Sequence, residues 1–182
     1  MKVVVFFAEG YEEIEALAVV DVLRRGGVEV VMAGANKKKV VSGRNIKIEM
    51  DALASEVDYT MVDMVVLPGG IPGVDHLYHS QVVKDIVGGF KVEEKWIGAI
   101  CAAPGVLGKW GLLEGEEATC YPGVESQLIG AKVSSERVVQ SHKIITGIGA
   151  GASLEFALKL LEVLLGKEKR VQIQEAMLIL GE

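Results

Sequence analysis

Several features that define common protein classes are scarce in this 182-residue sequence. It contains two cysteines, Cys101 and Cys120, so a secreted fold held together by disulfides is not expected. No apolar run is long enough to cross a bilayer, and the N-terminal apolar stretch is too short for a signal peptide. We therefore expect a cytoplasmic protein with no membrane partner.

Positive charge is also scarce. The formal net charge is -6, and the one basic run, residues 37–39, lies in a predicted turn. Phosphate binding requires clustered lysine and arginine side chains, so nucleic acid is not an expected partner. We interpret the basic run as a solvated loop tip.

Aliphatic side chains dominate the hydrophobic residues, since 50% of all residues are hydrophobic while 5% are aromatic. The chain is long enough to bury a sizeable core within a single domain, residues 1–182. Short, continuous apolar runs predict strands that are buried on both faces. These runs cover residues 3–7, 28–33, 64–67, 96–100 and 143–146.

Helical spacing of apolar residues separates the predicted strands. The first helix is expected to bury Ile14, Leu17 and Ala18 and to end at Gly26-Gly27. Alternating strands and helices imply an α/β fold with a mostly parallel, doubly wound sheet. The other predicted helices cover residues 79–88, a segment after Cys101, residues 153–166 and residues 167–180. Antiparallel additions are predicted near residues 39–41, 46–48 and 138–139.

Three chemically distinctive segments directly follow predicted strands. They are residues 10–15, the sequence Pro68-Gly69-Gly70, and Cys101. Ligands of open α/β sheets bind beyond the carboxyl ends of the strands. We therefore expect the three segments to meet in one site.

Cys101 lies between a predicted strand and a predicted helix, with small residues at Ala99 and Ala103. This pattern is typical of a nucleophile elbow, in which a sharp turn exposes the reactive side chain. A helix N-terminus stabilises a thiolate and can lower the thiol pKa from about 8.5 to roughly 3.5–7.5. An inert, buried cysteine is the alternative interpretation.

Glu15 lies close to the apolar face of the first predicted helix, so we expect its carboxyl group to be partly buried. A buried carboxyl group tends to keep its proton and can exchange it with a thiolate or a substrate. Gly69-Gly70 predicts a turn. If Cys101 is close to that turn, the backbone N–H groups of Gly70 and Ala102 are candidates for an oxyanion hole.

Residues 147–152, Gly-Ile-Gly-Ala-Gly-Ala, match the dinucleotide-binding pattern G-x-G-x-x-A. No later strand can supply the acid that binds a ribose, so we interpret the segment as a tight strand-to-helix turn. No paired metal-ligand motif is present, and we expect neither a metal nor another cofactor. None of the histidines is adjacent in sequence to Cys101, and Cys120 is interpreted as structural.

Four segments carry a family resemblance. They are Gly10-Tyr11-Glu12-Glu13-Ile14-Glu15, Val66-Leu67-Pro68-Gly69-Gly70, Ala99-Ile100-Cys101-Ala102-Ala103-Pro104 and Ser153-Leu154-Glu155-Phe156-Ala157. In this order and spacing they resemble the ThiJ/PfpI superfamily over nearly the whole chain, and within it the branch of the Parkinson's-disease-associated protein deglycase. The resemblance implies a flavodoxin-like three-layer α/β/α sandwich, usually a homodimer.

The resemblance also implies roles for individual residues. Cys101 is expected to be the oxidation-sensitive nucleophile, and Glu15 the carboxyl group hydrogen-bonded to it. Gly70 and Ala102 are expected to supply backbone donors. Gly69 is a candidate substrate contact.

Two positions depart from relatives that carry a histidine near the cysteine. The protease-like branch has a histidine where this chain has Ala102, and the human-like branch has one where this chain has Tyr121. A tyrosine hydroxyl can hydrogen-bond a substrate but is a poor base at neutral pH. We therefore treat Tyr121 as a candidate substrate contact and expect Cys101 and Glu15 to act without a histidine.

Our leading functional hypothesis is a cysteine-dependent enzyme of the glyoxalase or protein deglycase type that contributes to stress protection. Its substrates would be small reactive carbonyls or glycated groups. The alternative is a redox sensor or chaperone-like protein with an oxidisable cysteine and little turnover. A third interpretation, an intracellular cysteine peptidase, requires a histidine brought close by folding, for which His76 is the candidate.

Overall fold

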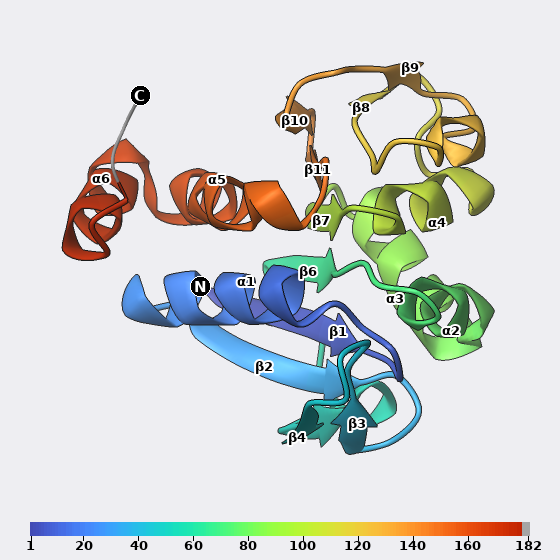
Figure 1. The fold of residues 1–182 in the computed structure, drawn as a ribbon, viewed down its shortest axis with the longest axis horizontal. Coiled ribbons are helices and arrows are strands. Elements are labelled where there is room, and N and C mark those ends of the chain that lie inside the picture. Colours follow the sequence, from blue (N-terminus) through green and yellow to red (C-terminus); the bar gives the residue numbers. More distant parts are fainter. Residues whose placement is uncertain (180–182) are drawn as a thin grey trace.

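A seven-stranded sheet forms the centre of the protein, with the strand order β10-β11-β7-β6-β1-β2-β5 (Figure 1). The computed structural model describes residues 1–179. Every neighbouring pair of strands is parallel except β10 and β11, which confirms the mostly parallel sheet. The strands are β1 (Lys2–Phe7), β2 (Glu29–Gly34), β5 (Ala52–Leu53), β6 (Met64–Leu67), β7 (Trp96–Ile100), β10 (Val138–Ser141) and β11 (Ile144–Gly147).

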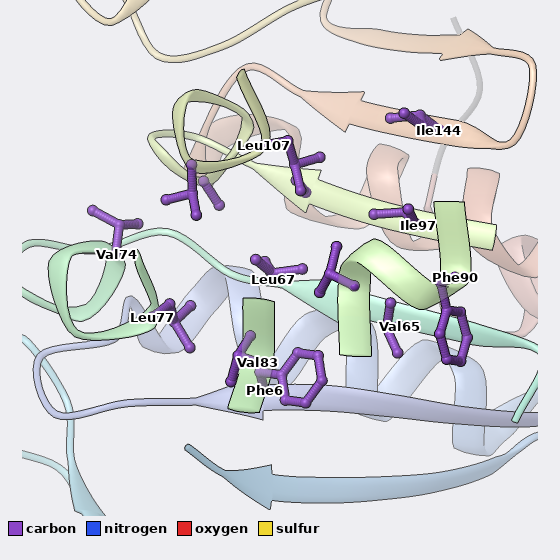
Figure 2. Packing of buried hydrophobic residues seen from close by; sticks show 14 of the residues in the cluster. Phe6, Val65, Leu67, Val74, Leu77, Val83, Phe90, Ile97, Leu107 and Ile144 are labelled. Atoms are coloured by element: carbon purple, nitrogen blue, oxygen red, sulfur yellow. The ribbon is translucent and has the colours of Figure 1, made fainter. Parts of the chain in front are cut away.

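The side chains of β1 show why the predicted strands are continuously apolar. Val4 and Phe6 pack against one group of helices, while Val3, Val5 and Phe7 pack against another. The first group consists of α2 (Gly73–His79), α3 (Gln81–Val92) and α4 (Ala103–Lys109), and Figure 2 shows part of its buried interface with the sheet. The second consists of α1 (Glu13–Arg25), α5 (Ser153–Leu165) and α6 (Lys167–Ala176). Both faces of the sheet are therefore covered, as the three-layer prediction requires.

The chain winds in both directions from β1, which pairs with β2 on one side and with β6 on the other. In such folds the crevice beyond the carboxyl ends of the strands is the usual ligand site. The strand register aligns these ends, because Leu67 of β6 pairs with Ala99 of β7, and Gly147 of β11 pairs with Ile100. The residues that follow β6, β7 and β11 consequently lie side by side.

Short strands supplement the central sheet. β3 (Lys39–Val41) and β4 (Lys47–Glu49) form an antiparallel hairpin, and β10 is antiparallel to β11, so these predicted additions are confirmed. A parallel pair, β8 (Glu117–Ala118) and β9 (Lys132–Val133), was not predicted. Two-residue strands have too few side chains to produce a periodic pattern.

Two helix predictions were wrong in detail. The helix predicted over residues 79–88 is present as α3, which begins at Gln81 and ends at Val92, but α2 before it was not predicted. The two helices meet at Ser80, whose hydroxyl caps α3 by accepting a hydrogen bond from the Val83 N–H. In α1, Ile14 is 58% exposed, whereas Val19 and Leu23 are fully buried. The buried face of α1 is rotated from the predicted one and includes Glu15. Residue 180, the predicted end of the last helix, lies outside the described residues.

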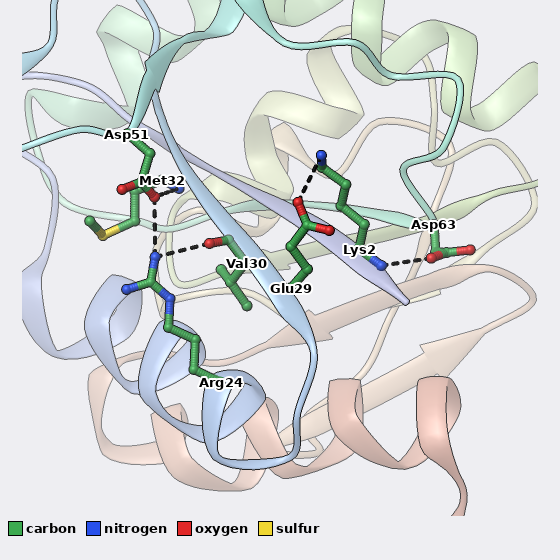
Figure 3. Close-up of polar contacts among 7 residues, drawn as sticks. All are labelled: Lys2, Arg24, Glu29, Val30, Met32, Asp51 and Asp63. Atoms are coloured by element: carbon green, nitrogen blue, oxygen red, sulfur yellow. Dashed lines mark hydrogen bonds and ion pairs between the residues drawn. The ribbon is translucent and has the colours of Figure 1, made fainter.

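Away from the carboxyl ends of the strands, ion pairs and hydrogen bonds connect the strands to neighbouring segments of the chain (Figure 3). The Arg24 guanidinium donates to the Val30 carbonyl at 2.9 Å and to Asp51 Oδ2 at 3.1 Å. The Lys2 backbone N–H donates to Asp63 Oδ2 at 2.7 Å. No helix within residues 1–179 has the length and apolar composition needed to span a bilayer.

Candidate active site

Cys101 is the residue that joins β7 to α4. Its φ of +65° is a left-handed conformation that costs a non-glycine residue roughly 1–2 kcal/mol. Two backbone contacts hold it there: the Cys101 N–H donates to the Gly147 carbonyl at 2.8 Å, and the Cys101 carbonyl accepts from the Tyr121 N–H at 2.8 Å. The side chain is partly exposed. This geometry agrees with the elbow predicted from the sequence.

Glu15 extends from the buried face of α1 and is fully buried. Its Oε2 atom accepts the Gly69 N–H at 2.8 Å. Oε1 has no hydrogen-bond partner among the described residues, and the Cys101 thiol lies close enough to the carboxyl group to affect its pKa. Burial raises the pKa of Glu15 to about 7, although hydrogen bonds from Cys101 and Gly69 oppose the rise. The carboxyl group can therefore gain or lose a proton near neutral pH.

The Cys101 thiol does not have the lowered pKa that we expected from its position before a helix. Burial, followed by the charge of the Glu15 carboxylate and its hydrogen bond, raises the thiol pKa to about 12. The N–H groups of Ala102 and Gly70 act in the opposite direction but are outweighed. The prediction was wrong because it considered the start of α4 and not the burial of the thiol or the carboxyl group that folding places beside the sulfur.

Cys101 and Glu15 titrate as a pair because each changes the protonation of the other. From about pH 7 to about pH 12 the pair holds one proton. When that proton is on the carboxyl group, the sulfur is a thiolate that faces the Gly70 and Ala102 N–H groups. Transfer of the proton from the sulfur to the carboxyl group thus creates the nucleophile.

Gly69 lies too close to the pair, and Gly70 too close to the backbone of residues 10–12, to carry a side chain. A Cβ atom at Gly69 would lie 2.5 Å from Glu15 Oε2 and 2.7 Å from Cys101 Cβ. Gly70 has a φ of +96°, and a Cβ atom there would lie 2.4 Å from the Glu12 backbone nitrogen. Bare backbone at these positions lets the loop after β6 contact both members of the pair.

We expect Gly70→Ala to destabilise the protein by about 2–4 kcal/mol, because steric overlap adds to backbone strain. Gly123→Ala is the matched control, since Gly123 has a similar φ of +94° but no atom within 4 Å of the place where a Cβ atom would lie. Its expected loss is about 1 kcal/mol, from backbone strain alone. Urea unfolding of both variants measures the difference, and equal losses would contradict the steric explanation.

Tyr121 lies on the opposite side of Cys101 from the Gly69-Gly70 turn. Its N–H binds the Cys101 carbonyl, and its side chain is 53% exposed. A Cβ atom at Gly149 would lie 3.3 Å from Tyr121 Cδ2, so the ring rests near bare backbone that follows β11, whereas the turn follows β6 on the other side of β7. Folding has brought together the six residues selected from the sequence, which are Glu15, Gly69, Gly70, Cys101, Ala102 and Tyr121.

Comparison with known proteins places the chain in a family. The DJ-1/PfpI family model matches residues 1–163. Protein dj-1beta of Drosophila melanogaster is 38% identical over 178 residues, which cover 96% of this chain and 95% of that protein. The chain belongs to the DJ-1/PfpI family.

Solved structures of other DJ-1 proteins share the fold. Oxidized DJ-1 of Toxoplasma gondii superposes with a TM-score of 0.93 at 39% identity, covering 97% of both chains.

The glutathione-independent glyoxalase DJR-1.2 of Caenorhabditis elegans is 36% identical over 163 residues, which cover 88% of this chain and 87% of that protein. Protein DJ-1 homolog B of Arabidopsis thaliana is 39% identical over 175 residues, but the chain spans 40% of its length.

The histidines of this DJ-1/PfpI chain are engaged elsewhere. His76 Nδ1 contacts the Glu9 carbonyl at 2.8 Å, His79 Nδ1 contacts the Asp75 carbonyl at 2.7 Å, and His142 Nδ1 contacts Glu116 Oε2 at 2.9 Å. Among the described residues, the groups that act on the Cys101 thiol are Glu15 and the backbone N–H groups of Ala102 and Gly70. His76 is therefore not positioned as the base that a Cys-His peptidase requires.

One part of the site was missed at the sequence level. The Gly147 carbonyl holds the Cys101 N–H, and Gly149 lies against the Tyr121 ring. The signal was the glycine-rich run over residues 147–152, which we interpreted only as a turn into a helix. In this family member the run also forms one wall of the cysteine site.

Proposed function

We propose that this chain is a glyoxalase-type enzyme that acts on small reactive carbonyl compounds, with Cys101 as the nucleophile and Glu15 as the proton carrier. The observation that carries the proposal is the pairing of a partly exposed thiol with a fully buried carboxyl group whose pKa is about 7. Two backbone N–H groups, from Gly70 and Ala102, face the same sulfur. The name of the related C. elegans protein supports this chemistry.

The proposed reaction begins when Glu15 accepts the thiol proton and the sulfur attacks the aldehyde carbon of a 2-oxoaldehyde. A carbon–sulfur bond forms, and the electron pair of the C=O bond moves to oxygen, which takes the proton from Glu15. The product is a hemithioacetal. Backbone N–H groups stabilise the negative oxygen while it exists.

In the second stage the Glu15 carboxylate removes the proton from the former aldehyde carbon, and the C–H electron pair forms a C=C bond while the neighbouring ketone oxygen becomes negative. That oxygen takes the proton of the hydroxyl group on the first carbon, whose O–H electron pair becomes the thioester C=O bond, and Glu15 delivers its proton to the neighbouring carbon. This transfer converts the hemithioacetal into a thioester of a 2-hydroxy acid. Water then cleaves the carbon–sulfur bond, which releases the hydroxy acid and restores the thiol. No net oxidation occurs, since one carbon is oxidised while its neighbour is reduced.

The test uses the Cys120→Ser variant, in which Cys101 is the remaining cysteine. We expect this variant to convert methylglyoxal to lactate at the wild-type rate without glutathione, because the Cys120 side chain is buried in the core with α2, α3 and α4, whereas Cys101 packs against the core on the other face of the sheet. Iodoacetamide should abolish turnover in proportion to the fraction of Cys101 alkylated, as determined by mass spectrometry. Full activity after complete alkylation would rule out the proposal.

A redox-sensing role is a second candidate, favoured by the partial exposure of the Cys101 thiol. The structure of the related T. gondii protein is of an oxidized form. Mild peroxide treatment followed by mass measurement separates the two roles. Stoichiometric sulfinate at Cys101, together with no turnover of any dicarbonyl, would favour the sensor over the enzyme.

A further inference from the structure

The residue whose backbone is hydrogen-bonded to Cys101 carries a large aromatic side chain with half of its surface exposed. Tyr121 is 53% exposed, although its backbone N–H is bound to the carbonyl of Cys101, which directly follows the buried end of β7. Exposed aromatic side chains in a ligand site offer a large contact area at a small cost in conformational entropy. The ring is therefore available to a molecule that is bound to Cys101.

The glycine-rich run supplies the second surface of this region. Gly147 receives the Cys101 N–H, and two residues later Gly149 presents bare backbone to the Tyr121 ring, with 3.3 Å between Tyr121 Cδ2 and the position of an added Cβ atom. Three contacts thus connect Cys101, the tyrosine and the glycine run. They fix the ring on the side of Cys101 opposite the Gly69-Gly70 turn.

The two sides of Cys101 differ in chemistry. On the Gly70 side, the N–H groups and the Glu15 carboxyl group interact with the sulfur and suit the oxygen of a carbonyl compound. On the Tyr121 side, the ring edge at Cδ2 and Cε2 lies next to Gly149, and the half-exposed ring offers apolar contact. A 2-oxoaldehyde whose oxygen occupies the Gly70 side directs its other substituent toward the tyrosine.

We propose that Tyr121 and Gly149 form a subsite for the substituent of the carbonyl substrate, and that this subsite selects flat, apolar substituents such as aryl groups over a methyl group. The inference rests on the proposed function for its choice of substrate. The selecting surface is the ring and not the hydroxyl group. Tyr121 is accordingly a specificity-determining residue that leaves the proton transfer to Glu15.

The first test compares phenylglyoxal with methylglyoxal as substrates. We expect kcat/KM to favour phenylglyoxal in the wild type, and Tyr121→Ala to reduce that preference about tenfold, mainly through KM. Tyr121→Phe keeps the ring and should keep the preference. An equal loss for both substrates in Tyr121→Ala would show a structural role and would overturn the subsite.

The second test does not depend on turnover. In the Cys120→Ser background, Cys101 is alkylated by phenacyl bromide or by bromoacetone, which differ in a phenyl and a methyl group. In each reaction a sulfur–carbon bond forms while a carbon–bromine bond breaks and bromide leaves. Rates are divided by those of free cysteine with the same reagents.

We expect the phenacyl-to-acetonyl rate ratio to fall at least about fivefold in Tyr121→Ala, a change that corresponds to the energy of one aromatic contact. In Tyr121→Phe the ratio should persist. An unchanged ratio in Tyr121→Ala overturns the subsite whether or not the protein is an enzyme. If the ratio falls while neither substrate is turned over, the subsite stands and the glyoxalase proposal fails.

Discussion

Replacing Cys101 with alanine is expected to reduce methylglyoxal turnover to the background rate, a loss of at least about a thousandfold. The reason is that the proposed covalent intermediate requires a carbon–sulfur bond, and no other described side chain beside Glu15 offers a nucleophile. Lactate formation at saturating methylglyoxal measures the loss. A preparation of Cys101→Ala that retains wild-type turnover would eliminate the covalent mechanism.

The fold should tolerate this substitution. Both backbone contacts of Cys101 are main-chain hydrogen bonds, to Gly147 and Tyr121, and alanine can make them as well. The left-handed φ is already strained for cysteine, so alanine adds little to that cost. Cys101→Ser is the second control, because a hydroxyl group beside Glu15 preserves the polar contact without a nucleophile of comparable strength. Circular dichroism and Tm should be close to wild type for both variants.

Replacing Glu15 with glutamine is expected to lower kcat/KM by about 10²- to 10⁴-fold, the range typical of a lost general acid–base group. Glutamine can still accept the Gly69 N–H through its amide oxygen. It cannot take up the thiol proton or move hydrogen between the substrate carbons. Unlike Cys101→Ala, this variant retains the sulfur, so Cys101 should still be alkylated by iodoacetamide.

The pH dependence of that alkylation identifies the proton carrier. In the wild type, the rate should rise through a midpoint near pH 7, where the pair loses its first proton because the pKa of Glu15 is about 7. In Glu15→Gln this midpoint should disappear, leaving the titration of a lone buried thiol. A midpoint near pH 7 that persists in the variant would show that another group controls the sulfur.

The same substitution should stabilise the protein at alkaline pH. Burial raises the pKa of Glu15 from 4.5 to about 7, so folding favours the protonated form. The contribution to stability is present below the unfolded-state pKa and is lost as pH rises through about 7. The cost of burying the ionised group is on the order of 3 kcal/mol above that pH. Glu15→Gln should therefore have a higher Tm than the wild type at pH 9 and show little advantage at pH 4.

The sequence was most informative about the central strands. Residues 3–7 and 64–67 form strands whose side chains are buried on both faces, and such strands appear as continuous apolar runs. The alignment of their carboxyl ends follows from parallel topology. Cys101, Glu15 and Gly70 were therefore predicted to meet before any distance was known.

The helices were less predictable where polar residues are buried. In α1, Glu13 and Glu15 face inward because Ser42 and Gly69 donate hydrogen bonds to their carboxyl groups. Apolar spacing does not reveal these partners, so the predicted face was rotated toward Ile14. The boundary at Ser80 was missed for another reason. The helix before it, α2, is short and starts directly after a turn, so it produces little periodic pattern.

Electrostatics depended most strongly on tertiary contacts. The position of Cys101 before α4 suggested a lowered thiol pKa, whereas burial and then the carboxyl group from α1 raise it. These two residues are far apart in the sequence, and their distance in space is set by the packing of α1 on the sheet. The rule that the start of a helix lowers a thiol pKa therefore predicted the wrong direction for the pKa shift of Cys101.

The attachment of Cys101 has a consequence for how the protein can change over evolution. Its position is secured through the peptide groups of residues 147 and 121, and not through the side chains that these residues carry. A mutation at position 121 can thus exchange the surface next to the sulfur without displacing the sulfur itself. If position 121 selects the substrate as proposed, the reactive centre and the range of molecules it accepts can be adjusted separately.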